Sequence, residues 1–298
     1  MSEGGGPHTH AQQTHAQQTH AQQTRAQQAH ARQTQARPAQ RSRPAREART
    51  MGNGALDGAV IAVAGAGGPA GRAALLRLAE AGATVVGADN DPERLAESVD
   101  AARYAHGGAT VTGETVDLLD LDSTRAWADR TEEEFGRVDG MVHLVGGWRG
   151  SQTFTKTDLG DWDLLEKLLI RTVQHTSLAF HEALQRSDRG RYVLVSAAGA
   201  SRPTAGNAAY SAAKAAAEAW TLAMADYFRK AGGEQGPASA AAILVVKALV
   251  HDAMRAERPN AKFAGFTDVR DLAEAVAGVW DKPAAEVNGY RLWLTEKP

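Results

Sequence analysis

Residues 60–71 read Val-Ile-Ala-Val-Ala-Gly-Ala-Gly-Gly-Pro-Ala-Gly, an apolar run that passes directly into a glycine-rich turn. The next residues, to Ala81, are rich in Ala and Leu and predict a helix over Ala70–Ala81. In a strand–turn–helix unit of this kind, backbone N–H groups and the positive end of the helix can approach a bound phosphate. Glycines also form ordinary turns, so it is this context that indicates a pyrophosphate-binding loop.

The rest of the chain after Leu56 continues this alternation of apolar runs and helical segments. Helical periodicity extends over Ser123–Phe135, Leu164–Leu184 and Ala208–Lys230. The expected strands are Ala59–Ala64, Thr84–Ala88, Ala109–Val116, Gly140–Val145, Arg191–Ser196, Ala240–Ala248 and Tyr290–Leu294. Strands that are apolar almost throughout are typical of a parallel sheet with both faces covered. We therefore predict an α/β fold over residues 51–298: a single doubly wound, Rossmann-like domain with a seven-stranded parallel sheet.

Residues 1–50 have a different composition, rich in Gln, His and Arg. From Thr9 the pentapeptide Thr-His-Ala-Gln-Gln occurs three times, and residues 9–33 contain no Val, Ile, Leu or aromatic residue to bury. We expect a disordered low-complexity tail. Its seven Arg and two Glu give +5, which leaves −7 for the remainder of a chain of net charge −2. A basic tail can contact polyanions, but this composition favours a solvated extension, so we expect neither nucleic-acid binding nor a metal site.

The composition also excludes several kinds of chemistry. The chain has no cysteine, so it has no disulfide, thiolate metal site or cysteine nucleophile. No apolar run approaches the ~20 residues that span a bilayer, and the polar N-terminus lacks the hydrophobic core of a signal peptide. We therefore expect a cytoplasmic protein with no membrane partner.

A candidate cofactor ligand follows the second predicted strand. Asp89 lies 18 residues beyond Gly71, where an acidic residue in such folds hydrogen-bonds the adenosine ribose. A carboxylate there repels a 2′-phosphate, and the next residue is Asn90 instead of Arg. Asp is also common in turns, but the glycine-rich loop before it favours the cofactor interpretation. We predict NAD as the cofactor, with NADP possible.

The strongest chemical pattern is Tyr210-Ser-Ala-Ala-Lys214, which follows a strand that ends in Ser196. Tyr and Lys four residues apart share one face of a helix. An ammonium beside a phenol stabilises the phenolate and lowers the tyrosine pKa, as an acid/base group requires. A serine hydroxyl from the preceding strand can hydrogen-bond a substrate carbonyl.

This ordered set closely resembles the catalytic core of the short-chain dehydrogenase/reductase family. The resemblance implies that Tyr210 is the acid/base, that Lys214 binds the nicotinamide ribose and tunes Tyr210, and that Ser196 orients the carbonyl. Ser196 precedes Tyr210 by 14 residues, whereas the usual family spacing of 13 falls on Ala197, which has no hydroxyl. The implied cofactor-binding residues are Gly65, Gly67, Gly68, Gly71, Asp89, Asp117, Gly146, Tyr210 and Lys214. Asp117 would reach the adenine, although it could equally cap a helix.

Four departures from the family pattern bear on activity. Pro69 replaces the middle glycine of the loop, and His143-Leu-Val-Gly146 replaces the family's Asn-Asn-Ala-Gly. We interpret His143 as a buried strand imidazole. Leu169 takes the position of an asparagine that holds a relay water, and Lys247-Ala248 replaces a Pro-Gly pair.

From these residues we expect an NAD(P)-dependent oxidoreductase that transfers hydride between the cofactor and a small carbonyl or alcohol substrate. The alternative is a non-catalytic dinucleotide-binding or sensing protein that kept the fold. The resemblance also implies a homodimer or homotetramer that pairs through the helices at 164–184 and 208–230.

Overall fold

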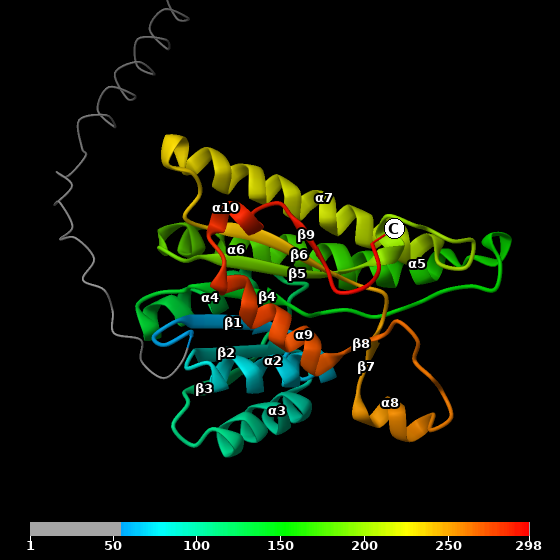
Figure 1. Ribbon diagram of the computed structural model, residues 1–298, viewed down its shortest axis with the longest axis horizontal. Coiled ribbons are helices and arrows are strands. Elements are labelled where there is room, and N and C mark those ends of the chain that lie inside the picture. The colour runs from blue at the N-terminus through cyan, green and yellow to red at the C-terminus, as the bar shows by residue number, and fades with distance from the viewer. Residues whose placement is uncertain (1–54, 298) are drawn as a thin grey trace, which may run out of the picture. The chain divides into compact units, whose positions relative to one another are not determined.

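The sheet has the predicted doubly wound form. The computed structural model describes residues 55–297, so the predicted tail at 1–50 lies outside the described residues. Seven strands pair in parallel in the order β3-β2-β1-β4-β5-β6-β9 (Figure 1). They are β1 (Val60–Ala64), β2 (Thr84–Asp89), β3 (Val111–Thr115), β4 (Gly140–His143), β5 (Arg191–Ala197), β6 (Ala240–Val246) and β9 (Arg291–Trp293). The fold class inferred from the sequence is therefore confirmed.

Helices connect successive strands of this sheet. They are α2 (Pro69–Glu80), α3 (Pro92–Ala105), α4 (Leu121–Phe135), α5 (Leu159–Glu166), α6 (Thr172–Arg186), α7 (Ala208–Ala231), α8 (Asp252–Glu257), α9 (Val269–Ala277) and α10 (Ala284–Val287). A second, two-stranded parallel sheet joins β7 (Leu249–Val250) to β8 (Thr267–Asp268). Among residues 55–297, no helix combines the length and the apolar character needed to cross a membrane.

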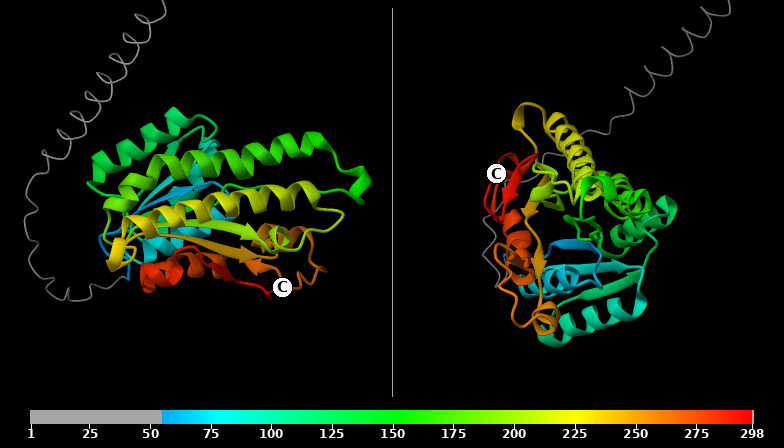
Figure 2. Two further views of the ribbon diagram at one scale, coloured as in Figure 1. Left: turned by 90° about the horizontal axis from the view of Figure 1, so that it is seen from above. Right: turned by 90° about the vertical axis from the view of Figure 1, so that its right-hand side faces the viewer.

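The sheet is buried on both faces because its strands are apolar at consecutive positions. In β1, Ile61 and Val63 join one hydrophobic core, which α2, α3 and α9 cover. Ala62 and Ala64 join the other core, which α4, α6 and α7 cover. Side chains alternate between the two faces of a strand, so a strand without polar residues fits only between two layers of helices. Figure 2 shows helices on both sides of the sheet.

The long predicted helix at 164–184 is interrupted in the structure. Helix α5 ends at Glu166, a π-helical turn (η2) occupies Lys167–Arg171, and α6 begins at Thr172. A π turn holds one more residue than an α-helical turn, and such turns are frequent at functional sites. Here the turn includes Leu169, the position where the family resemblance implies an asparagine.

Strands β1 and β4 are neighbours, although their connections run in opposite directions across the sheet. In open α/β sheets, this topological switch point leaves a crevice at the carboxyl ends of the strands, where ligands bind. The glycine-rich turn after β1 and the segment from Leu144 to Gly146 after β4 both lie at this edge.

Candidate active site

The turn after β1 is so tightly packed that two of its glycines are required. Gly65 has a φ of +80°, and a Cβ on it would lie 2.8 Å from the backbone nitrogen of Val145. A Cβ on Gly71 would lie 2.1 Å from the carbonyl oxygen of Gly65. Helix α2 therefore starts directly against the turn, so a ligand can approach its amino end closely.

The backbone N–H groups of this turn are divided between the fold and a possible ligand. Gly65 and Ala66 both donate to the carbonyl oxygen of Ala88, at 2.9 and 3.0 Å. The first helical hydrogen bond of α2 runs from Arg72 N to Gly68 O at 2.8 Å. Among the described residues, the amides of Ala70 and Gly71 have no acceptor. Pro69 starts the helix and has no N–H to lose, so its replacement of a glycine leaves these two donors in place.

Asp89 ends β2 and faces the glycine-rich turn. Its Oδ2 accepts a hydrogen bond from Gly67 N at 2.9 Å, and its Oδ1 accepts one from Asp91 N at 3.1 Å. An ionised carboxylate has about four acceptor positions, so two remain for ligand hydroxyls. The half-buried Asp89 side chain is therefore fixed in place and still able to bind.

A cavity of about 240 Å³ lies between the turn, the ends of β2 and β3 and the segment after β4. Gly65, Asp89, Asp117 and Gly146 line it together. The structure thus brings these predicted cofactor residues to one place. The helix-capping alternative for Asp117 is wrong, because Asp120 caps α4, while Asp117 accepts from Leu119 N at 2.9 Å.

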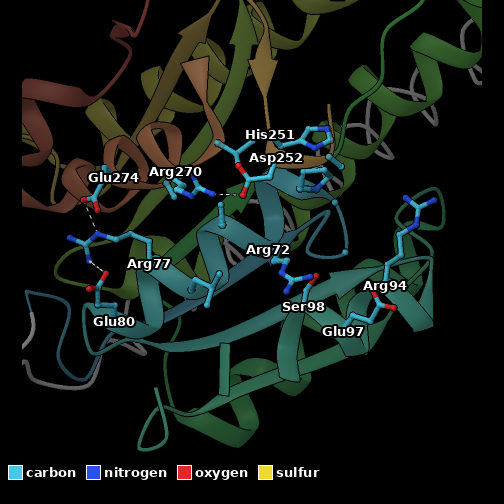
Figure 3. Close-up of a pocket in the computed structure, with 18 of the residues that line it drawn as sticks. Arg72, Arg77, Glu80, Arg94, Glu97, Ser98, His251, Asp252, Arg270 and Glu274 are labelled. Atoms are coloured by element: carbon cyan, nitrogen blue, oxygen red, sulfur yellow. Dashed lines mark hydrogen bonds and ion pairs between the residues drawn. The ribbon is translucent and has the colours of Figure 1, made fainter. Parts of the chain in front are cut away.

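A larger groove of about 700 Å³ continues from the turn along the outer side of α2 (Figure 3). Gly67 and Gly68 form one end, and α3, α8 and α9 supply the walls. The formal charges of the groove cancel, because four arginines and four acidic residues line it. They are Arg72, Arg77, Arg94, Arg270, Glu80, Glu97, Asp252 and Glu274. Within residues 55–297, Arg72 forms no ion pair, whereas Arg270 pairs with Asp252 and Arg77 pairs with Glu274.

Tyr210 and Lys214 both lie on α7, as the sequence predicts. Tyr210 is half-buried and packs with Leu165 and Leu169 of α5 and the π turn. This burial raises the pKa of Tyr210 to about 12. We expected the ammonium to lower the pKa of Tyr210, but burial dominates it in this structure. Tyr210 is therefore a protonated phenol at neutral pH.

Lys214 is almost fully buried, at 6% exposed, and its Nζ donates to the carbonyl oxygen of Val195 at 2.8 Å. Burial lowers the pKa of Lys214 to about 8, while the neighbouring Glu218 carboxylate raises it. Lys214 is thus held against β5 next to Tyr210. Leu169 connects this pair to the cavity, because a Cβ on Gly146 would lie 3.9 Å from the Leu169 Cδ2 atom.

Ser196 does not face the space expected for a substrate carbonyl. It is 0% exposed, and its Oγ donates to Glu218 Oε1 at 2.6 Å. Side chains alternate along a strand, so the next residue, Ala197, points to the other side. Ala197 also has the family spacing from Tyr210 but no hydroxyl. The expectation that Ser196 orients the carbonyl thus differs from the observed geometry, in which its hydroxyl is bound to Glu218.

His143 ends β4 and is 1% exposed, which confirms a buried imidazole. Its Nε2 lies 3.2 Å from Thr172 Oγ1 and its Nδ1 lies 3.1 Å from Thr176 Oγ1. These two hydroxyls donate to backbone carbonyl oxygens, Thr172 to Leu168 at 2.7 Å and Thr176 to Thr172 at 2.9 Å. Burial and the Lys214 ammonium lower the pKa of His143 to about 3. A neutral imidazole therefore stands on β4 where the family pattern has the first asparagine of Asn-Asn-Ala-Gly. It contacts the start of α6, directly after the π turn.

Sequence reasoning missed Glu218 and Arg291. They form an ion pair at 2.6 Å between α7 and β9. The i, i+4 spacing from Lys214 could have placed Glu218 on the Tyr210–Lys214 helix face, whereas no local signal indicated Arg291. Lys247 lies outside this cluster, since its Nζ donates to Ala264 O at 3.1 Å.

A doubly wound parallel sheet with a glycine-rich turn at its switch point defines a Rossmann-like protein. The chain belongs to the short-chain dehydrogenase/reductase family, because the family's sequence profile, described as short chain dehydrogenase, matches residues 59–232. It is therefore a member of an oxidoreductase family that binds NAD or NADP.

Individual relatives agree with this assignment. A putative short-chain type dehydrogenase/reductase of Mycolicibacterium smegmatis is 29% identical over 54% of this chain, and the match spans 62% of that protein. The 3-oxoacyl-[acyl-carrier-protein] reductase FabG of Vibrio harveyi is 26% identical over 80% of this chain and 96% of its own length. A short chain oxidoreductase of Pseudomonas aeruginosa PAO1, solved with NADPH bound and described as containing an atypical catalytic center, superposes with a TM-score of 0.70. It is 26% identical and covers 79% of this chain and 94% of its own.

Proposed function

We propose that this protein is an NAD-dependent oxidoreductase that interconverts a small carbonyl compound and the corresponding alcohol. The observation that carries the proposal is the packing of Tyr210, one helical turn before Lys214, beside Leu169, whose side chain reaches Gly146 at the edge of the Asp89 cavity. Tyr210 and Lys214 thus lie close to the Asp89 cavity at the switch point of the sheet, which supports the proposal.

The residues present fit a nicotinamide dinucleotide. Gly65 and Gly71 let the turn pack directly against the segment after β4 and the start of α2, and the amides of Ala70 and Gly71 leave free donors at the amino end of α2. Asp89 keeps two acceptor positions for ribose hydroxyls. When bound, the cofactor supplies or accepts the hydride.

The chain's own residues handle the proton. In the reductive direction, Tyr210 donates its phenolic proton to the carbonyl oxygen as hydride arrives at the carbonyl carbon, and the phenolate then takes a proton from solvent. Lys214 stabilises that phenolate through its positive charge. The pKa of about 12 keeps Tyr210 protonated and ready to donate at neutral pH. In this scheme Ser196 hydrogen-bonds Glu218 and does not contact the substrate carbonyl.

The preference for NAD over NADP is part of the proposal. The Asp89 carboxylate lies beside Gly67, and Arg94, which also lines the cavity, is paired with Asp91 at 3.0 Å. A 2′-phosphate would meet the Asp89 charge directly, whereas the arginine that lines this cavity, Arg94, already has a partner.

The test is a comparison of Tyr210→Phe with wild type for NADH binding and for reduction of a panel of small ketones and aldehydes. We expect unchanged NADH binding and a ~10²–10⁴-fold lower turnover, because the variant lacks its proton donor. Tyr104→Phe, on an exposed residue of α3, is the matched control. Equal turnover by both variants would refute the role of Tyr210. NADH binding by wild type without turnover of any panel member would favour the non-catalytic alternative.

We further propose that the protein forms a homodimer or homotetramer through α6 and α7. Leu178, Trp220 and Tyr227 are 43%, 36% and 43% exposed and line a mostly apolar hollow of about 270 Å³ between these helices. Exposed apolar patches of this kind mark interaction sites. Light scattering should show a smaller assembly for Trp220→Glu and no change for Tyr104→Glu. A cytoplasmic location stays a prediction from the sequence.

A further inference from the structure

Glu218 is a buried acidic residue that the proposed reaction does not use. It is 2% exposed and lies one helical turn beyond Lys214, which itself lies one turn beyond Tyr210. Residues at i, i+4 and i+8 share one face of a helix. A buried carboxylate destabilises a fold unless it is paired and hydrogen-bonded, so its position next to Lys214 requires a reason.

Both oxygens of Glu218 have a charged or hydroxyl donor from the sheet. Ser196 Oγ donates to Oε1 at 2.6 Å, and Arg291 Nε donates to Oε2 at 2.6 Å. Ser196 lies on β5 and Arg291 on β9, the two neighbours of β6. The carboxylate is therefore fixed by two strands and cannot change its position independently of the sheet.

Lys214 is anchored to the same strand. Its Nζ donates to the carbonyl oxygen of Val195, the residue directly before Ser196. Two consecutive residues of β5 thus hold two consecutive turns of α7. In the described part of the chain, the titratable groups that face Lys214 are Glu218 and Tyr210 on its own helix and the neutral His143 on β4. Strand β6 is wholly apolar, and Arg291 reaches Glu218 from β9.

We propose that Glu218, clamped by Ser196 and Arg291, is a positioning residue that holds Lys214 as a protonated ammonium beside Tyr210. The C-terminal strand, through Arg291, is then part of the support of the active site. The inference rests on the proposed function only for its effect on turnover, because the charge of Lys214 can be measured without a substrate.

The experiment follows the charge of Lys214 directly. Lysine labelled with ¹³C at Cε is titrated by NMR in wild type, and the resonance is assigned by its loss in Lys214→Met. In Glu218→Gln we expect the Lys214 titration to move to lower pH, with a proton affinity lower by roughly tenfold or more, because an opposite charge within one helical turn has been removed. Glu132→Gln, which breaks the remote α4–α6 ion pair with Arg186, should leave it unchanged.

Two further variants keep the test decisive if Glu218→Gln does not fold. Glu218→Asp retains the charge and should keep most of the wild-type titration. Arg291→Met removes a positive charge from a side chain that is 37% exposed, so Lys214 should titrate at higher pH than in wild type. An unchanged Lys214 midpoint in Glu218→Gln, or in Arg291→Met if the former is unfolded, would overturn the proposal. If the Lys214 midpoint moves but neither the wild type nor any variant shows turnover, the proposed function fails, while the positioning role of Glu218 stands.

Discussion

Replacing Asp89 with Asn tests the cofactor site most sharply, because the change is isosteric and removes one charge. Asp89 accepts one hydrogen bond on each carboxylate oxygen, from Gly67 N and from Asp91 N. In Asn, an NH₂ group replaces one of these oxygens, so one of the two hydrogen bonds is lost. A ribose hydroxyl bonded to a carboxylate is worth about 1.5–3 kcal/mol, against about 0.5–1.5 kcal/mol for a neutral acceptor. The loss of ~1–1.5 kcal/mol predicts NADH binding about 5–10-fold weaker.

The same substitution should strengthen NADPH binding. Two unit charges about 5 Å apart at an effective dielectric constant of about 20 repel by ~3 kcal/mol, and the half-buried position of Asp89 reduces this value through solvent screening. Removing the repulsion predicts a gain of ~10–100-fold for NADPH. Fluorescence titration of both cofactors measures the ratio of their affinities, which should change by at least ~50-fold in Asp89→Asn. Asp117→Asn, across the cavity, should affect both cofactors alike. A wild-type preference for NADPH, or a ratio that changes less than about twofold, would refute the role given to Asp89.

Two further predictions concern the turn and the buried imidazole. Gly71→Ala should weaken NADH binding at least ~10-fold, because its Cβ would lie 2.1 Å from a loop oxygen, whereas Gly107→Ala, with open space around it, should bind normally. Equal binding by the two variants would contradict the packing argument. His143 has a pKa lowered to about 3, below its unfolded value of about 6.5, so it contributes stability above pH 6.5 that is lost as the pH falls toward 3. Urea unfolding of wild type should lose up to ~1.4 kcal/mol per pH unit across this window through this residue, and His143→Gln should show a flatter profile; parallel profiles would contradict it.

The fold was predictable from the sequence because burial on both faces leaves a strong local signal. The central strands of the sheet are apolar runs bounded by turns, and the glycine-rich unit at residues 60–71 indicates which end of the sheet binds ligands. Strand ends were less certain: the run at 240–248 stops at Val246, and Leu249–Val250 pairs with β8 instead. That pairing joins residues that are 18 positions apart, which no local pattern indicates.

The predicted cofactor residues lie at the ends of neighbouring strands and meet in one cavity, whereas the residues around Tyr210 were predictable only where they share one element. Tyr210 and Lys214 lie on one helix, so their spacing was sufficient to place them together. The direction of Ser196 was not predictable, because it depends on Glu218 from α7 and Arg291 from β9, which meet only in the folded chain. The effect of burial on the Tyr210 phenol also depends on Leu165 and Leu169, whose approach is set by the π turn.

The π turn restricts how the segment from α5 to α6 can be redesigned. A turn of this kind corresponds to a single residue inserted into an α-helix, and each residue of an α-helix rotates the following ones by about 100°. Deleting one residue from Lys167–Arg171 would restore a regular helix, but it would turn Leu165 and Leu169 relative to Thr172 and Thr176. The helix could then pack against Tyr210 or hold His143, but it could not do both. The segment therefore cannot lose even one residue. A graft, or a sequence alignment that removes the extra residue as a gap, would separate the contact with Tyr210 from the contact with His143.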